Sequence, residues 1–339
     1  MVCRPPENGS DTISLARRHL TVVIVGGAAA AFLPGITRAR TPESSRLLLP
    51  FSPNGPTEMV GSVPATRVQR AMQSAARSSL SDLLAGVLVR MIEAHLGQPV
   101  QIERIPVAAR AVAGAARDVR DARTLMLVSE ALCVFAAVAD EAIGVAIDRL
   151  LPVATCVQVP YLAVAGGPGQ PGSAAQAAPS VGVVPGLRCV IASAGYGGRS
   201  SQLARASVHR LGEGCREASF NGGASALTAL LGGQVDAAML PLPLVAPWLA
   251  DGTLQALAAP ASPQVDSGGW FAILASPGWT LIEVDRLSTA LGEALRAEPI
   301  ASYLNRLGMV AKFETRQQLA GRIASERRIW LAEKKSGAL

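Results

Sequence analysis

The chain is poor in aromatic and charged residues. Of its 339 residues, 4% are aromatic and 17% are charged, whereas 50% are hydrophobic. Few aromatics and many alanines, glycines and valines fit layered α/β structure, in which helices pack closely on a sheet. The net charge of +6 is raised by arginines near the N-terminus, and no basic stripe interleaved with aromatics occurs. Nucleic-acid binding is therefore not expected.

The sequence also lacks the spacings of metal sites and of serine hydrolases. Its three histidines, His19, His95 and His209, are isolated from one another, and neither HExxH nor CxxC occurs. The alternative of an exported α/β hydrolase would use Ser193 or Ser200, but GxSxG surrounds neither serine. We therefore expect no metal, no cofactor and no enzymatic activity.

The N-terminal apolar run is too short to span a membrane. Leu20 to Leu33 is about 14 residues long, whereas a spanning helix needs about 20. Arg17 and Arg18 precede the run and small residues follow it, which is the layout of a cleaved signal peptide over residues 1–40. The sequence thus predicts export, by the Sec route or, through the paired arginines, by the twin-arginine route.

Cysteine is infrequent and never clustered. One of the five cysteines, Cys3, lies in the predicted signal region. An even number in an oxidising compartment permits disulfides. However, the other four stand singly in apolar segments, which favours buried, small hydrophobic side chains; they are Cys133, Cys156, Cys189 and Cys215.

Short apolar segments alternate with amphipathic ones from Arg46 onward, which predicts α/β units with parallel sheets. The run RLLLPF (46–51) indicates a buried strand, and PVATCVQVPYLAVAGG (152–167) indicates a pair of strands. A helix is expected from its N-cap Ser81 to its stop at Gly97. Its expected inward residues are Leu83, Leu84, Val87, Leu88 and Met91.

Three loops follow predicted strands and precede predicted helices: PNGPTE (53–58), AGYGGRSS (194–201) and FNGGAS (220–225). Ligands of open α/β sheets bind at the carboxyl ends of the strands, so these loops are expected to face a common crevice. They offer backbone N–H donors more than charged side chains, which suits binding rather than catalysis. Gly222-Gly223 would leave room for an anion at a helix start, and Gly232-Gly233 would end that helix.

The order of these motifs resembles the Bug family, also called TctC, the periplasmic solute-binding receptors of tripartite tricarboxylate transporters. The resemblance runs from about Arg46 to Lys334 and rests on RLLLPFSPNGPTE, ASAGYGG and FNGGASALTALLGGQVD in combination. It implies an α/β, two-lobed periplasmic binding protein fold, type II-like, with a ligand cleft between the lobes. Residues 46–148 and 259–339 would form one lobe, and residues 149–258 the other.

The resemblance also implies a small carboxylic acid as solute, held without catalysis, metal or cofactor by a monomeric protein. Membrane transporter subunits or a sensor kinase would be the partners. An insertion makes Asp82 compete with Glu58 for the acidic position. The remaining implied ligand-binding residues are Ser52, Pro53, Asn54 and Gly55; Ser193, Ala194, Gly195, Tyr196, Gly197 and Gly198; and Phe220, Asn221, Gly222, Gly223 and Ala224.

Several alternatives stay open at this stage. Arg199 could pair with a carboxylate or face solvent, and Ser200 and Ser201 fit helix N-caps better than ligand contacts. The segments 58–82 and 106–114 depart from the family pattern. The chain could therefore have altered specificity, or be a binding-impaired member that acts as an interaction partner.

Overall fold

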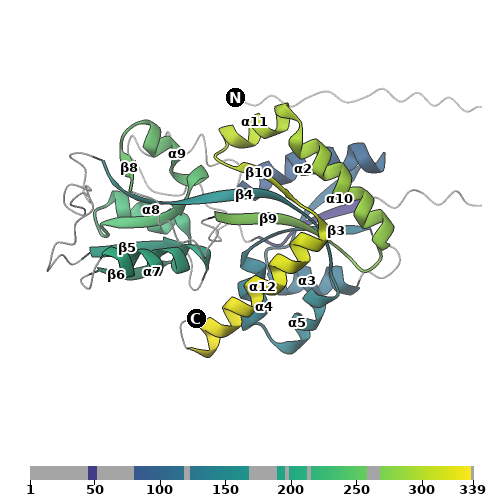
Figure 1. Cartoon of the computed structure of the whole chain (residues 1–339), viewed down its shortest axis with the longest axis horizontal. Coiled ribbons are helices and arrows are strands. Elements are labelled where there is room, and N and C mark those ends of the chain that lie inside the picture. The colour runs from purple at the N-terminus through teal and green to yellow at the C-terminus, as the bar shows by residue number, and fades with distance from the viewer. Residues whose placement is uncertain are drawn as a thin grey trace, which may run out of the picture. The chain divides into compact units, whose positions relative to one another are not determined.

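A computed structural model describes the chain over residues 45–51, 80–117, 123–167, 189–194, 198–211, 215–257 and 268–336. The predicted signal peptide and the predicted first loop lie outside these residues. Strands and helices alternate over much of the described chain, as the sequence predicted, but two helices follow each other within 131–148 and within 281–306, and two strands within 254–275 (Figure 1). The sheet is not purely parallel as predicted, since its central pairs are antiparallel. The strands of the described part are β1 Ser45–Leu49, β2 Val100–Arg104, β3 Thr124–Ser129, β4 Leu151–Gly166, β5 Cys189–Ala194, β6 Cys215–Phe220, β7 Ala237–Pro241, β8 Leu254–Ala256, β9 Gly268–Ala275 and β10 Val310–Glu314.

The strands are hydrogen-bonded in the order β2-β1-β3-β9-β4-β7-β5-β6, and β8 and β10 also pair with β4. The three strands β1, β2 and β3 are mutually parallel where they pair, as are β5, β6 and β7. Strand β4 joins the two groups, since it pairs antiparallel with both β9 and β7. We call β1, β2, β3, β9 and β10 the first sheet region, and β5, β6, β7 and β8 the second sheet region. Strand β4 is shared by the two regions.

Strand β4 is one continuous strand of 16 residues, so the predicted pair of strands is wrong (Figure 1). The sequence suggested a break because proline cannot donate a ladder hydrogen bond. In the structure Pro160 pairs with Gly268 at the end of the β9 ladder, and Tyr161 pairs with Pro241 of β7. The proline thus lies where β4 changes partners, and the strand continues into the second region.

Helices cover both faces of both regions. One face of the first region buries apolar residues against α2, α10 and α11, and the other against α3, α4, α5 and α12. In the second region α8 and α9 cover one face and α7 the other. The helices are α2 Leu80–Leu96, α3 Ala108–Arg117, α4 Ala131–Val138, α5 Glu141–Asp148, α7 Arg199–Leu211, α8 Gly223–Leu231, α9 Leu242–Ala250, α10 Leu281–Arg296, α11 Glu298–Arg306 and α12 Arg316–Lys335.

Helix α2 differs from the prediction in its start and in its buried face. It begins at Leu80, so Ser81 is buried inside the helix and does not cap it. Of the five expected inward residues, Leu84 and Leu88 are fully buried, whereas the other three are half-buried. The buried face differs from the predicted one because it also includes the small residues Ser81 and Ala85. Its members are Leu80, Ser81, Leu84, Ala85, Leu88, Val89 and Ile92. The end at Gly97 is confirmed by a φ of 66°.

Two of the four cysteines form a disulfide, so their interpretation as free, buried residues is wrong. Cys189 and Cys215 begin the neighbouring parallel strands β5 and β6 in register, with Cα atoms 4.3 Å apart, and their sulfurs are bonded. The sequence could not show this register, since the two positions are 26 residues apart. Cys133 and Cys156 are buried free thiols, as predicted.

Candidate functional site

The carboxyl ends of the parallel strands in the two regions point toward the same stretch of β4. At the end of β3, Ser129 pairs with Phe271 of β9, and Phe271 pairs with Val157 of β4. At the end of β7, Pro241 pairs with Tyr161 of β4. Because β3 runs in the same direction as β4 and β7 in the opposite direction, the two ends approach Val157–Tyr161 from opposite sides. This is where an α/β sheet places its ligand crevice.

The predicted second and third loops leave the sheet side by side. Ala194 at the end of β5 is in register with Phe220 at the end of β6. Helix α8 then begins at Gly223, and its N-cap Gly222 has a φ of 98°, which only glycine adopts readily. The N-cap residue Gly222 has no side chain with which to cap α8. Gly222 and Gly223 are buried and Asn221 is exposed, and the N–H groups of a helix's first turn have no acceptor within the helix itself.

Gly233 ends the same helix. Its φ of 69° is left-handed, and its N–H donates to the carbonyl of Leu230 at 3.0 Å. The next residues turn into β7, where Asp236 accepts a hydrogen bond from the backbone of Val190 at 2.8 Å. The two glycine pairs therefore differ in the way the sequence predicted, one at a helix start and one at a helix end.

Ser193 is buried at the end of β5 and its hydroxyl is engaged. It donates to Glu217 at 2.7 Å and lies 3.2 Å from the hydroxyl of Ser219. These partners are on the neighbouring strand β6, so the interaction ties β5 to β6. Phe220 next to Ser219 is half-buried and packs against the second region's core.

Ser200 lies inside α7 and does not cap it, so its N-cap interpretation is wrong. Its hydroxyl accepts a hydrogen bond from the N–H of Ala194 at 2.7 Å and donates to the carbonyl of Met239 at 2.6 Å. Ser201 is likewise a buried residue of α7. Ser200 thus fixes the start of α7 to both β5 and β7.

Arg199, the first residue of α7, is buried, so the solvent-facing alternative is wrong. Its side chain is 6% exposed, and its Nη2 lies 3.0 Å from Oε1 of Glu326 on α12. Its Nη1 donates to Gln202 at 2.8 Å, while its Nε has no partner in the described structure. The carboxylate that Arg199 contacts is therefore one of the chain's own.

Glu130 is a buried acidic residue at the crevice that the sequence analysis missed. It follows the last residue of β3, and its carboxylate accepts a hydrogen bond from the N–H of Trp270 at 3.1 Å. Burial raises the pKa of the Glu130 carboxyl, although the Arg199 guanidinium opposes this rise. The available signal was TLMLVSEALCV, in which an acidic residue stands between a buried strand and a helix.

Asp82, one of the two residues predicted for the acidic position, does not lie at the crevice. Asp82 is in the first turn of α2 with an exposed side chain, and it forms an ion pair with Arg104 at the end of the edge strand β2. Gly198 directly precedes α7 and Ala224 is buried in α8. The remaining predicted residues lie outside the described structure: Ser52, Pro53, Asn54, Gly55, Glu58, Gly195, Tyr196 and Gly197.

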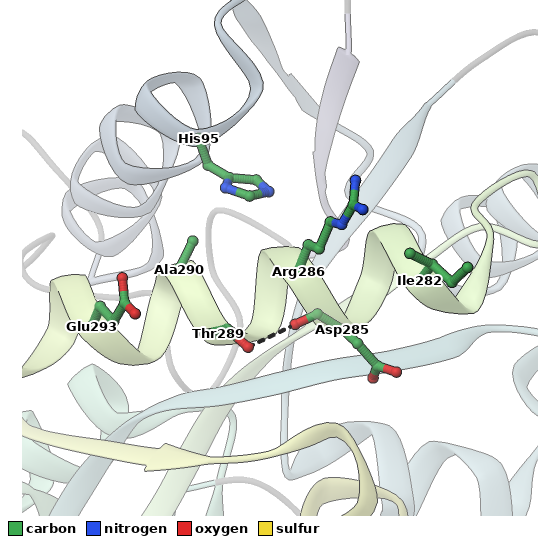
Figure 2. Close-up of a pocket in the computed structure, with 7 residues that line it drawn as sticks. All are labelled: His95, Ile282, Asp285, Arg286, Thr289, Ala290 and Glu293. Carbon is green, nitrogen blue, oxygen red and sulfur yellow. Dashed lines mark hydrogen bonds between the residues drawn. The ribbon is translucent and has the colours of Figure 1, made fainter.

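A surface groove of about 530 Å³ lies between α2 and α10, the helices that cover one face of the first region. Figure 2 shows His95 projecting from α2 toward a row of α10 side chains. None of its residues belongs to the predicted site, and none follows a strand. The lining residues are His95, Ile282, Asp285, Arg286, Thr289, Ala290 and Glu293. We assign it no part in solute binding.

Neither a metal site nor a membrane span is found in the described parts of the chain. No three His, Cys, Asp or Glu side chains there are grouped so as to hold a metal ion. No helix described is long and apolar enough to cross a membrane.

Solved structures show which class of protein has this fold. The chain matches a TctC solute-binding protein from Polaromonas at a TM-score of 0.57 and 17% identity, covering 88% of this chain and 99% of that one. It matches MatC from Rhodopseudomonas palustris, with bound malate, at a TM-score of 0.56 and 22% identity, covering 85% of this chain and 98% of that one. An R. palustris protein with adipate matches at a TM-score of 0.62 and 16% identity, covering 88% of this chain and 98% of that one. The fold is therefore that of the two-lobed periplasmic binding proteins.

A family model identifies the particular family. The model of the tripartite tricarboxylate transporter family receptor, TctC, matches residues 84–333. No curated protein matches the chain. The chain belongs to the TctC receptor family, whose members bind solutes for transport, and the expected fold class and family are confirmed.

Proposed function

We propose that this chain is an exported, periplasmic receptor that captures a small carboxylate-bearing solute without reacting with it and presents it to a tripartite transporter. Family membership supports the receptor role. MatC with malate and the R. palustris protein with adipate, two proteins of the same fold, indicate carboxylates as the first solutes to test. The signal peptide predicted within residues 1–40 would direct export and then be cleaved.

The observation that carries the proposal is the arrangement at the middle of β4. Strand ends of both regions point there, and the uncapped, glycine-started helix α8 leaves the same edge as α7. One helix start favours a nearby anion by about 0.3–1 kcal/mol, so further donors must converge on the same carboxylate. Micromolar affinity corresponds to about 8 kcal/mol, which such a site can supply.

We assign the two lobes to residues 46–148 with 259–339 and to residues 149–258. The buried cores support this division except at its first boundary: two cores draw on residues 47–159 and 270–330 and the other two on residues 161–257, so residues 150–159 pack with the first lobe. The solute would be held between the lobes by the three loops 52–58, 193–198 and 220–224, with Glu58 or Asp82 in the acidic role. We further propose a monomer that acts with transporter subunits or a sensor kinase.

The test changes one charge at the start of α8. Ser225 is exposed in the first turn and bonds only locally, to the carbonyl of Asn221 at 3.2 Å. Ser225→Asp places a carboxylate at a helix start, which helps the helix but repels an anionic solute. Ser225→Asn has nearly the same shape without the charge and is the matched control.

Melting temperatures would be measured with malate, adipate, amino acids and nicotinate. A solute at 100 times its Kd stabilises the folded state by about 2.7 kcal/mol. We expect one acid to raise the melting temperature of the parent and of Ser225→Asn, but not of Ser225→Asp. Equal shifts in both variants would contradict the assignment to α8, and no shift by any acid at millimolar concentration would contradict the receptor function.

A further inference from the structure

Helices α7 and α12 belong to different sheet regions. Leu319 and Trp330 of α12 are buried in a core of the first region. Leu203 and Ala204 of α7 are buried in a core of the second region. Any direct bond between side chains of α7 and α12 therefore joins the two regions outside the strand β4 that they share.

Three such bonds are present. Arg199 and Glu326 form the buried ion pair described above, with N···O 3.0 Å. About two helical turns further along each helix, Arg205 and Glu333 form a second pair at 2.8 Å. Gln202 also donates to Glu333, at 2.9 Å. The bonds thus form a row along one side of α7.

The α12 side of this row is held firmly in the first region. The indole N–H of Trp270 on β9 donates to the Glu326 carboxylate at 2.9 Å. The ammonium of Lys334 donates to the carbonyl of Ala137 on α4 at 2.9 Å. The positions of Glu326 and Glu333 are therefore set by the first region, and α7 brings its cations and Gln202 to them.

The buried ion pair between Arg199 and Glu326 is incompletely hydrogen-bonded, which favours its reversible separation. Only one nitrogen of Arg199 contacts one oxygen of Glu326, while Nε of the arginine and Oε2 of the glutamate have no partner in the described structure. Both atoms would regain water if the helices separated, which offsets part of the lost attraction. Hinge closure is the established motion of periplasmic binding proteins as a class.

We propose that Arg199, Gln202, Arg205, Glu326 and Glu333 form a clasp that holds the second region against the first, independently of solute. Arg199 and Glu326 are then positioning residues, because they fix the start of α7 beside the carboxyl end of β3. If the proposed receptor function is correct, the clasp also sets the apparent affinity, since it determines the fraction of molecules already closed.

The test measures a distance between the regions in purified protein without added solute. Spin labels would be placed at Ala250→Cys on α9 and Thr289→Cys on α10, both exposed positions. The chain would start after residue 40, which removes Cys3, and the free thiols of the described residues, Cys133 and Cys156, are buried. Pulsed electron paramagnetic resonance gives the distance distribution. In Glu326→Gln and in Glu333→Gln we expect a longer-distance population, with the ratio of closed to open molecules reduced about tenfold in the buried-pair variant.

Asp148→Asn is the matched control. It removes a pair between α12 and α5, Arg327–Asp148 at 2.5 Å, that lies wholly within the first region, so the distribution should not change. An unchanged distribution in both folded clasp variants would overturn the proposal, whatever the solute-binding result.

Discussion

At the scale of single residues, the chain keeps an acid where solvent is nearly absent. Glu130 is 5% exposed, and its carboxylate accepts a hydrogen bond from the backbone of β9. A Cβ on Gly269 would lie 2.6 Å from Oε1 of Glu130, so glycine at that position gives the carboxylate its space. A buried carboxylate lowers the stability of the folded state unless hydrogen bonds compensate for its lost hydration.

We predict that Glu130→Gln stabilises the protein at neutral pH. Because burial raises the pKa of Glu130 above its ordinary 4.5, the ionised form is disfavoured in the folded state. Stability is thus lost as pH rises from 4.5 through the raised folded pKa, and the neutral amide avoids this loss. The free energy of unfolding, measured with urea, should exceed that of the parent at pH 7.5 and approach it near pH 4. A variant less stable at both pH values would show that the ionised form is needed.

Residues of this kind also show where sequence reasoning stopped. The glycine roles at 222 and 233 were predictable because each depends on the local backbone. The burial of Arg199 was not, since its partner Glu326 is 127 residues away and the pairing depends on tertiary packing. The role of Glu130 depends likewise on β9, 140 residues later.

At the scale of elements, apolar runs predicted strands well. The run RLLLPF at 46–51, predicted as a buried strand, forms β1 at Ser45–Leu49, because it is short and its leucines are buried. The extent of β4 was not predictable, since a proline inside a strand is read locally as a break, whereas here it lies at a change of partners. Helices α4 and α5 and strand β10 were not anticipated.

The disulfide at the start of β5 and β6 should contribute measurably to stability. Closing a loop of 26 residues restricts the unfolded chain, which corresponds to about 3 kcal/mol in the chain-entropy model. We expect reduction with a phosphine, or the double substitution Cys189→Ser and Cys215→Ser, to lower the free energy of unfolding by roughly that amount. Reductant should have no further effect on the double variant. Equal stability of oxidised and reduced protein would contradict the prediction.

The end of β4 should tolerate no side chain. A Cβ on Gly167 would lie 2.1 Å from the carbonyl oxygen of Gly252, a backbone atom in the turn before β8. Gly167→Ala should therefore destabilise the protein by about 1–3 kcal/mol. Gly86→Ala in α2 is the control, because nothing lies within 4 Å of its added Cβ and alanine favours a helix. Thermal melting should separate the two variants in opposite directions from the parent.

At the scale of the whole molecule, the family resemblance supplied what local patterns could not. Alternation of strands and helices predicted α/β units, but the strand order and the meeting of both regions at β4 depend on long-range pairing. The first and second loops fall partly or wholly outside the described residues, so the predicted site remains a proposal there.

The two regions should unfold together. Val157 and Val159 of β4 are buried in a core of the first region and Val164 in a core of the second, so neither core keeps its packing if β4 leaves. We predict a single calorimetric transition whose measured and van't Hoff enthalpies agree. Two resolved transitions would show that the regions are energetically independent.

The place of β9 also has a consequence for biosynthesis. This strand, Gly268–Ala275, lies between β3 and β4 although it is translated after both. A ribosome has therefore delivered every strand of the second region before the first region can acquire its central one. Strands β1, β2 and β3, although synthesised early, therefore lack their neighbour β9 until most of the chain has been translated.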